Sequence, residues 1–325
     1  MPGLPRRFAL EAGCDENLDR LPFAQGGKMT TPSATQARTD RPEDATIERL
    51  RPRLFGIAFR MLGDFQRAED VVQEAMLRWH LTDPASVREP GAWLTSVVTR
   101  LAIDQLRHAA AVRAIYPGPW LPEPVADERV SPEYRSELAS DLSMAFLILL
   151  ERLAPEERAA FLLRDVFGTD YGEIARVLGK SQAAARQMVH RARERVRADR
   201  PRFTAPPGAK ERLLGRFVTA IETGDKDALL ALFKQDAAWT ADGGGRVRAA
   251  GRVLRGAERI ARMLLKLQAK FGYRFTHRLR HLNGELAVVE YEGDRVFAAT
   301  FCELDGERIS AMYRVLNPEK LTHVS

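Results

Sequence analysis

The sequence predicts a multidomain chain in which two all-α domains precede one α+β domain. Apolar residues recur at helical spacing from Thr46 to Arg113 and again from Glu137 to about Arg200. Beyond Pro206 the pattern changes to helices followed by four segments of alternating, strand-like character, separated by NG, GD and DG turn signals. Helices followed by such an antiparallel meander are typical of an α+β domain.

Composition limits the classes of protein to which the chain can belong. Its 325 residues suit two or three domains, and 45% hydrophobic residues can supply sizeable cores. A net charge of +6 permits a nucleic-acid partner without requiring one. Cys14 and Cys302 form no metal-ligand spacing, so we expect no metal and a reducing, cytoplasmic setting. The longest apolar run, Met144 to Leu150, is far shorter than the ~20 residues of a membrane helix, so no membrane partner is expected.

The first 42 residues are rich in Thr, Ser, Pro and Gly and have no sustained period. We predict a disordered leader over 1–42, and Met29 is an alternative start of translation. The domain after it spans 43–113 as a helix bundle. Its first helix ends near Gly63, a plausible C-cap, and Asp64 is a plausible N-cap for the helix that follows.

Two boundaries divide the rest of the chain. Residues 114–135 contain five prolines and little periodicity, which indicates a stiff, extended linker. A second helical domain over 136–203 follows, and PPG at 206–208 marks the next boundary. The last domain, 208–325, is expected to contain helices at about 209–223, 225–235 and 256–270, a strand at WTAD (239–242), and strands at 273–282, 285–292, 295–304 and 307–316.

The most specific local signal is TDYGEIARVLGKSQAAARQMVHRARERVRADR. Asp170 and Glu173 have the spacing of a capping box, Gly179 suits the end of a helix, and Ser181 can cap the next one. A short turn with glycine between two helices is typical of a helix-turn-helix. The second helix is expected to bury Ala185, Val189, Ala192 and Val196.

Charge distinguishes the second helix of this motif from the rest of the chain. Seven arginines lie between Ser181 and Arg202, against one Glu and one Asp. The outer face is expected to present Gln182, Arg186, His190, Arg193 and Arg197. Arginine suits both phosphates and guanine edges, so this face predicts DNA binding. The alternative is an amphipathic helix with a solvated basic face.

Three motifs in order support a family resemblance. The stretches AEDVVQEAMLRW and EPGAWLTSVVTRLAIDQLR resemble the sigma-2 domain of extracytoplasmic-function (ECF) sigma factors, and SQAAARQMVHRARERV resembles their sigma-4 domain. The match covers about 43–200. YPGPWLPEPV, DGGGRVRA and LNPEKL further resemble the SigJ-like subgroup, which carries a C-terminal SnoaL-like domain. The resemblance implies a sigma-2 helix bundle, a sigma-4 helix-turn-helix and a SnoaL-like α+β cone domain.

The resemblance also implies a function and partners. The chain would be a sigma factor that directs core RNA polymerase, through its β′ clamp helices and β flap, to promoter DNA. The implied polymerase-binding residues are Asp70, Val72, Gln73, Glu74, Leu77 and Arg78. Those implied for the −10 element are Trp93, Arg100, Asp104 and Arg107, although Trp93 could instead be a core aromatic. Those implied for the −35 element are Ser181, Gln182, Arg186, Gln187, His190, Arg191 and Arg193.

The extra C-terminal domain is expected to regulate the sigma domains in cis through an intramolecular contact. The implied contact residues are Trp120, Leu121, Pro122, Glu123, Pro124, Asp242, Gly243, Gly244, Gly245, Arg246, Asn317, Pro318, Lys320 and Leu321, and Arg248 is a further candidate. DGGGRVRAAG (242–251) lacks the Lys-Ser/Thr of a phosphate-binding loop, so a glycine-permitted turn at this contact is preferred over phosphate binding.

Two other classes of function remain open at this point. A DNA-binding repressor or activator could use the cone domain to sense a small ligand, and a DNA-tethered cyclase or isomerase could use it for catalysis. Asp236, Asp242, Tyr273 and His277 are polar candidates for acid–base chemistry. Nothing in the sequence marks a nucleophile with its base, so we expect no enzyme activity, no catalytic residues and no cofactor. His277 is more simply explained as a strand residue that is hydrogen-bonded or solvated.

Overall fold

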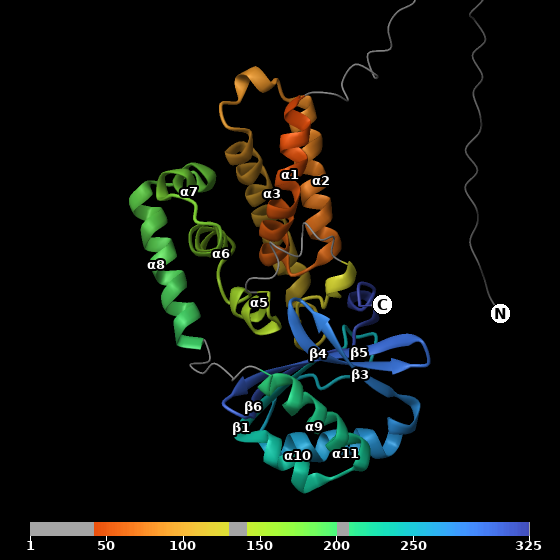
Figure 1. Cartoon of the computed structure of the whole chain (residues 1–325). Coiled ribbons are helices and arrows are strands. Elements are labelled where there is room, and N and C mark those ends of the chain that lie inside the picture. Colours follow the sequence, from red (N-terminus) through yellow and green to blue (C-terminus); the bar gives the residue numbers. More distant parts are fainter. Residues whose placement is uncertain (1–41, 130–141, 200–207, 325) are drawn as a thin grey trace, which may run out of the picture. The chain divides into compact units, whose positions relative to one another are not determined.

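The structure, a computed structural model, describes residues 42–129, 142–199 and 208–324 (Figure 1). Residues from Ala45 onward form one compact unit. The predicted leader and the alternative start Met29 lie outside the described residues. Within the described ranges, every helix is too short or too polar to cross a bilayer.

Three helices form the first block, and their ends follow the sequence signals. They are α1 (Pro42–Leu62), α2 (Phe65–Leu81) and α3 (Pro90–Ala114), with a 3-10 turn η1 (Pro84–Ser86) between the last two. Gly63 ends α1 with φ of +66°, and Asp64 caps α2 by accepting a hydrogen bond from Arg67 N at 3.0 Å. Both predicted caps are confirmed.

The second block contains the predicted helix-turn-helix. Its elements are α5 (Met144–Leu150), α6 (Pro155–Phe161), the π-helical segment η3 (Leu162–Val166), α7 (Tyr171–Leu178) and α8 (Gln182–Asp199). One hydrophobic core runs through both blocks, from Leu54 and Trp79 to Leu163 and Val189. The two helical regions therefore share a buried core in this structure.

The C-terminal region is an α+β domain, as predicted. Its helical elements are α9 (Ala209–Thr223), α10 (Lys226–Leu232), α11 (Ala257–Phe271), η4 (Gly272–Arg274) and η5 (Pro318–Lys320). Its strands are β1 (Phe233–Asp242), β2 (Leu254–Arg255), β3 (Thr276–Leu282), β4 (Glu285–Glu292), β5 (Arg295–Asp305) and β6 (Arg308–Val315).

The six strands form one mixed sheet in the order β2-β1-β6-β5-β4-β3. The predicted antiparallel meander is correct for β3 to β6. The expected helix over 225–235 was too long, because the chain already enters β1 at Phe233. Pairing of β1 with β6 is parallel, which local alternation could not show.

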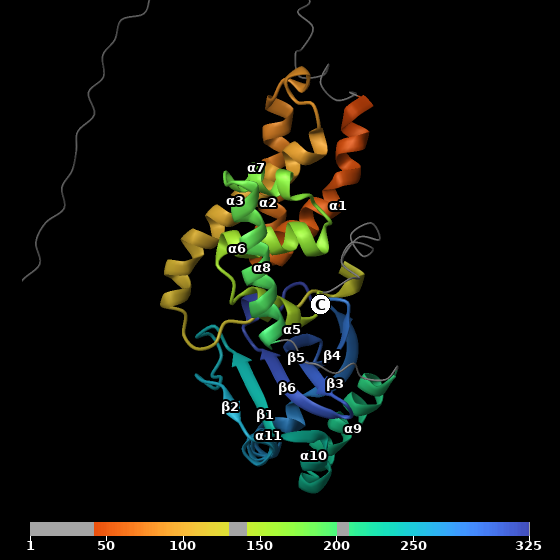
Figure 2. The same ribbon diagram turned by 90° about the vertical axis from the view of Figure 1, so that its left-hand side faces the viewer.

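The two faces of this sheet bury different parts of the chain. One face packs against α9, α10 and α11, with Trp239, Val288 and Met312 in its core (Figures 1 and 2). The opposite face buries Phe301 and Val315 in a second core. That core also contains Leu121 and Ala126 of the linker, Met144 of α5, and Leu321 and Val324 of the C-terminus. Because side chains alternate along a strand, β4, β5 and β6 each contribute to both cores.

The linker is an extended segment fixed to the sheet. Ala126 forms an isolated antiparallel bridge with Leu282, and the short turn η2 (Asp127–Arg129) follows it. Asn283 occupies the β3–β4 turn with φ of +54°, as the NG signal predicts for a tight hairpin. Its side chain also accepts a hydrogen bond from Val125 N at 2.7 Å and donates one to Glu123 O at 3.1 Å.

We predict that Asn283→Ala lowers the free energy of unfolding by about 3 kcal/mol. Two buried hydrogen bonds contribute about 1 kcal/mol each, and alanine at positive φ adds about 1 kcal/mol. Asn283→Gly removes the same hydrogen bonds without the backbone strain, so it should cost about 2 kcal/mol. Urea denaturation of both variants measures the difference, and wild-type stability in both would contradict this role for Asn283.

Candidate functional site

The helix-turn-helix is built from the caps that the sequence predicts. The Asp170 carboxylate accepts hydrogen bonds from Gly172 N at 2.7 Å and Glu173 N at 3.0 Å. These donors lower the pKa of Asp170. Gly179 ends α7 with φ of +62°, and Ser181 Oγ accepts from Ala184 N at 3.2 Å to begin α8. The four predicted inner residues of α8 are all buried.

The basic residues of α8 fall into two groups. Arg186, His190 and Arg197 are exposed on the outer side of α8, as are Gln182 and the preceding Ser181. Other basic residues of α8 have acidic partners on neighbouring helical segments. Arg193 Nε lies 2.8 Å from the Asp165 carboxylate, which raises the pKa of Arg193. Arg191 and Arg195 both pair with Glu157 of α6.

Two residues predicted to contact DNA lie toward α6 instead of the outer face. Gln187 and Arg191 line a pocket of about 450 Å³ together with Glu156 and Glu157. By contrast, the Arg186 guanidinium lies 5.4 Å from the ring centre of Tyr171 and remains solvent-exposed. Arg186 is therefore the arginine of α8 best placed to meet a phosphate or a base edge.

The surface of α2 presents the acidic and apolar residues that the sequence suggested. Asp70, Gln73, Glu74, Leu77 and Arg78 are exposed. Leu77 has 53% of its surface exposed, so an apolar side chain lies among these polar ones. Arg78 Nε pairs with Glu74 at 2.8 Å.

Val72 was expected on this polymerase-binding surface, and the structure corrects that expectation. Its side chain is only 2% exposed and is part of the helical core, whereas the next residue, Gln73, is exposed. It supports α2 from inside and cannot contact a partner directly.

Two of the four residues predicted for the −10 element, Arg100 and Arg107, contact the second helical block. Arg100 Nε donates to Val177 O at 2.9 Å and its Nη2 to Arg176 O at 3.0 Å, at the C-terminal end of α7. Arg107 bonds both Asp104, at 3.1 Å, and Glu156 of α6, at 2.7 Å. These two arginines of α3 thus already have protein partners.

Trp93 is half-buried rather than free on the surface. Its ring meets Trp79 edge-to-face, with centroids 5.7 Å apart, and packs against the helical core. This packing agrees with the alternative that Trp93 is a core aromatic.

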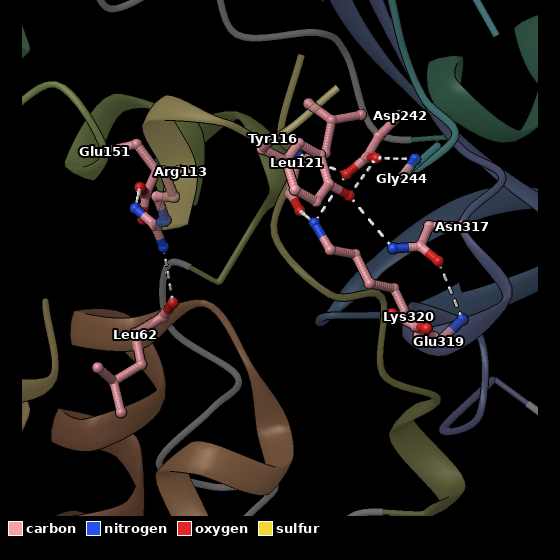
Figure 3. A network of polar contacts seen from close by, with 10 residues as sticks. All are labelled: Leu62, Arg113, Tyr116, Leu121, Glu151, Asp242, Gly244, Asn317, Glu319 and Lys320. Carbon is pink, nitrogen blue, oxygen red and sulfur yellow. Dashed lines mark hydrogen bonds and ion pairs between the residues drawn. The ribbon is translucent and has the colours of Figure 1, made fainter. Parts of the chain in front are cut away.

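A buried carboxylate, Asp242 at the end of β1, joins the linker to the C-terminal domain (Figure 3). It is fully buried and accepts hydrogen bonds from Tyr116 Oη at 2.6 Å, Leu121 N at 2.9 Å and Gly244 N at 3.0 Å. Lys320 Nζ lies 2.7 Å from Oδ2 of the same carboxylate. Four donors from three segments therefore converge on this side chain.

Lys320 and Arg113 enclose the linker tryptophan. The ammonium of Lys320 lies 4.0 Å from the Trp120 ring centre, and the Arg113 guanidinium lies 3.9 Å from it. Such contacts are favourable cation–π geometries. Burial lowers the pKa of Lys320, whereas the neighbouring Asp242 carboxylate acts in the opposite direction. Burial and Asp242 together raise the pKa of Tyr116.

The remaining predicted linker residues also lie at this contact. Leu121, Pro122, Glu123 and Pro124 are all buried. Glu123 accepts a hydrogen bond from Phe65 N of α2 at 2.8 Å and lies 2.6 Å from His323 Nδ1. Burial raises the pKa of Glu123. The linker therefore contacts both the first helical block and the C-terminal segment.

The C-terminal motif LNPEKL completes the contact. Asn317 donates to Tyr116 Oη at 3.2 Å and caps η5, in which Pro318 is exposed, while Leu321 is buried against the sheet. Arg246 pairs with Glu319 on the surface at 2.7 Å. Arg248 has no ionic or hydrogen-bond partner among the described residues, so its expected polar contact is not seen there.

At each glycine of DGGGR, an added side chain would clash with a neighbouring atom. A Cβ at Gly243 would lie 2.1 Å from Val247 O, and one at Gly244 would lie 2.3 Å from Asn317 Nδ2. A Cβ at Gly245 would lie 2.6 Å from Pro117 Cγ in the linker. Gly244 and Gly245 also have positive φ, of +58° and +71°. The stretch is thus a turn that lets two chain segments approach closely.

Several residues of the contact were not singled out from the sequence. Tyr116 and Arg113 flank the proline-rich segment, and their side chains reach the contact only because the linker folds back. Glu151 bridges Arg113 and Arg158, and Arg158 is 2% exposed and donates to Met61 O at 2.5 Å. A buried arginine in α6 has no local sequence signal, since its partners are distant in the chain.

The polar candidates for catalysis do not share one set of partners. Asp242 takes part in the contact with the linker, while Tyr273 is 88% exposed. Asp236 is exposed on β1, and His277 Nδ1 lies 3.0 Å from Glu222. Among the described residues, no group of three or more His, Cys, Asp and Glu side chains could hold a metal ion.

Known protein families match the two helical blocks and the C-terminal domain. Residues 46–112 match Sigma-70 region 2, residues 143–196 match Sigma-70 region 4, and residues 214–316 match the SnoaL-like domain. The ECF RNA polymerase sigma factor SigJ of Mycobacterium tuberculosis H37Rv is 37% identical over 86% of this chain and 93% of its own length. The chain belongs to the ECF sigma factors of the SigJ type. It is a promoter-directing sigma factor with a SnoaL-like C-terminal domain.

Two further relatives support the assignment to the ECF sigma factors. The probable sigma factor SigI of the same species is 32% identical over 69% of this chain and 77% of its own length. The crystal structure of M. tuberculosis SigJ is similar with a TM-score of 0.70 and 35% identity, over 86% of this chain and 99% of that one. The predicted family and the three-part fold class are confirmed, and core RNA polymerase and promoter DNA follow as partners of this ECF sigma factor.

We predict that Gly245→Ala loosens the linker of this sigma factor. The added methyl group must displace the Pro117 ring, because both lie on constrained backbone. Hydrogen–deuterium exchange of the peptide containing Leu121, whose amide donates to Asp242, should become faster. Gly306→Ala is the matched control, since Gly306 has φ of +64° but a Cβ added there would meet no atom within 4 Å. Equal exchange in both variants would contradict the steric role of Gly245.

Proposed function

We propose that this sigma factor uses α2 to bind core polymerase, α3 to engage the −10 element and α8 to bind the −35 element, in the cytoplasm where the polymerase works. The β′ clamp helices would receive α2, and the β flap would receive the second helical block. The C-terminal domain regulates these steps in cis. It does so without catalysis of its own, because its polar candidates have separate partners.

The observation that carries the regulatory part is the burial of the Asp242–Lys320 pair. Asp242 is fully buried and the Lys320 side chain is 13% exposed, so neither charge is satisfied by water once the contact forms. Removing one partner from such a pair costs about 3 kcal/mol. Tyr116 Oη and Leu121 N of the linker both donate to this buried carboxylate, so it can hold the linker against the domain and can be released by a competing partner such as the polymerase.

The contacts between the two helical blocks give a second reason why the closed linker contact limits promoter binding. Arg100 and Arg107 of α3 bond α7 and α6, so the backbone and carboxylate oxygens of those helices occupy the donors that would meet DNA phosphates. Met144 of α5 and Leu121 of the linker are buried together against the sheet. The sheet therefore helps to hold the second helical block in contact with α3. Release of this arrangement shifts the population toward a form able to bind the promoter.

The polymerase assignment rests on the surface of α2. Exposed Leu77 beside Asp70, Gln73 and Glu74 combines an apolar anchor with negative charge, which suits a basic helical partner. A simple repressor has no need of this surface. The acidic α2 and the basic α8 therefore favour a bridge between polymerase and DNA.

We predict that Asp242→Asn raises run-off transcription by core polymerase at least threefold. The neutral amide keeps the volume but accepts the linker's hydrogen bonds from Tyr116 Oη and Leu121 N more weakly than the carboxylate does, so the closed contact loses about 1–3 kcal/mol. Asp305→Asn is the matched control, because Asp305 pairs with Lys234 of β1 away from the linker. Unchanged or lower transcription with Asp242→Asn would contradict inhibition through this contact.

We predict that Arg186→Ala weakens binding to a promoter fragment containing the −35 element. Loss of one phosphate contact should reduce the slope of log affinity against log salt concentration by about 0.9. Fluorescence anisotropy at several salt concentrations measures both quantities. Arg216→Ala removes an equal charge from the exposed side of α9 and should leave the slope unchanged. Equal slopes for Arg186→Ala and wild type would remove α8 from the DNA interface.

A further inference from the structure

The C-terminal domain contains a cavity of about 590 Å³ between its sheet and α11. Its walls are mostly apolar, with Phe217 of α9, Leu264 and Leu267 of α11, and Phe297 and Met312 of the sheet. A volume of this size matches sites that enclose small organic molecules. None of the roles assigned above uses this cavity.

Three buried donors in the cavity wall have no partner among the described residues. They are Nε1 of Trp239, Oγ1 of Thr300 and Nε of Arg314. Trp239 is 3% exposed and Thr300 is 2% exposed, so solvent does not satisfy them at the surface. A buried donor without an acceptor costs about 1–3 kcal/mol, and three that line one cavity favour a ligand with an oxygen acceptor.

Register places Thr300 and Arg314 side by side, and Trp239 is two residues from Ala241, the partner of Arg314 on β1. Arg314 of β6 is paired with Ala241 of β1 on one side and with Thr300 of β5 on the other. Arg314 also lies 2.5 Å from Glu290, which is 6% exposed, so an ion pair fixes its guanidinium. The polar part of the cavity is thus rigid and nearly neutral, which suits an uncharged oxygen better than a carboxylate.

Exposed lining residues show where the cavity opens. They are Arg248, Met263, Lys266, Lys270 and Arg274. Arg274 pairs with Glu292, whereas Arg248, Lys266 and Lys270 have no acidic partner within the described ranges. The positive opening disfavours cationic ligands.

We propose that this cavity binds a mainly apolar, uncharged small molecule that carries a carbonyl or hydroxyl oxygen. The apolar body contacts the phenylalanine and leucine walls, and the oxygen accepts hydrogen bonds from Thr300, Trp239 and Arg314. Binding satisfies donors that the protein itself leaves unpaired, so the ligand gains both burial and hydrogen bonds.

The cavity is coupled to the linker contact through neighbouring residues of the same two strands, a step that rests on the proposed function. Trp239 and Ala241 of β1 line the cavity, and the next residue is Asp242. Arg314 and Leu316 line it too, and Leu316 N and Asn317 N both donate to Asp242 O, at 2.7 and 3.0 Å. Occupancy of the cavity therefore acts on the two chain segments that hold the buried carboxylate.

The test uses 6-propionyl-2-(dimethylamino)naphthalene, a neutral fluorescent ketone, with the full-length protein. We expect saturable binding at one site per chain and an emission maximum that reports a hydrogen-bonded carbonyl. Thr300→Val should weaken binding about fivefold, the effect of one lost hydrogen bond, and shift the emission to the blue. Ala250→Phe, which fills part of the cavity, should weaken it at least tenfold.

Matched controls separate this site from adventitious binding. Thr99→Val removes another buried hydroxyl without a partner among the described residues, in α3, and should leave binding unchanged. The parent 2-(dimethylamino)naphthalene, which lacks the ketone, should bind more weakly than the ketone and show no loss with Thr300→Val. Because Thr300→Val removes an unpaired hydroxyl, its thermal stability should equal or exceed that of wild type. Equal binding by wild type, Thr300→Val and Ala250→Phe, or no saturable binding, would overturn the proposed site.

Run-off transcription with and without the ketone tests separately whether the cavity is coupled to the linker contact. We expect at least a twofold change for wild type and none for Ala250→Phe. Binding without any change in transcription would overturn the coupling to the linker contact and leave the site itself supported. Absence of binding would overturn the site while the Asp242→Asn result still decides the proposed function.

Discussion

A single buried carboxylate organises the junction between the sigma domains and the C-terminal domain. Because Asp242 is fully buried, its charge must be satisfied by protein donors, and these come from the linker, the glycine turn and the C-terminal turn. The same requirement explains the neighbouring glycines, since side chains at Gly244 and Gly245 would push the surrounding segments apart. Close packing of the linker is therefore a consequence of satisfying one charge.

The sheet connects this junction with the interior of its own domain. Alternating side chains place the helices and the cavity on one face and the linker with α5 on the other. Adjacent positions on β1 and β6 thus contact different parts of the chain. In the coupling proposed above, a change on one face would shift strands whose other face holds the linker.

The two helical blocks contact each other through arginines of α3. Arg100 bonds the carbonyls at the end of α7, where the negative end of the helix dipole favours a cation. A phosphate offers the same kind of acceptor. In the function proposed above, protein and DNA would compete for this guanidinium, and the population of the closed form would decide which one is bound.

Local patterns were enough to predict most helices, their caps, the helix-turn-helix and the β3–β6 meander, because these depend on periodicity and on residues close in the chain. The family followed from the resemblance of short motifs to those of known sigma factors. Other features became visible only in the folded chain: the parallel pairing of β1 with β6, the burial of Val72, the acidic partners of Arg191 and Arg193, and the convergence of Tyr116 and Lys320 on Asp242. Most of these features join residues far apart in the sequence. Their energies come from burial and hydrogen bonding between distant segments, which local patterns do not encode.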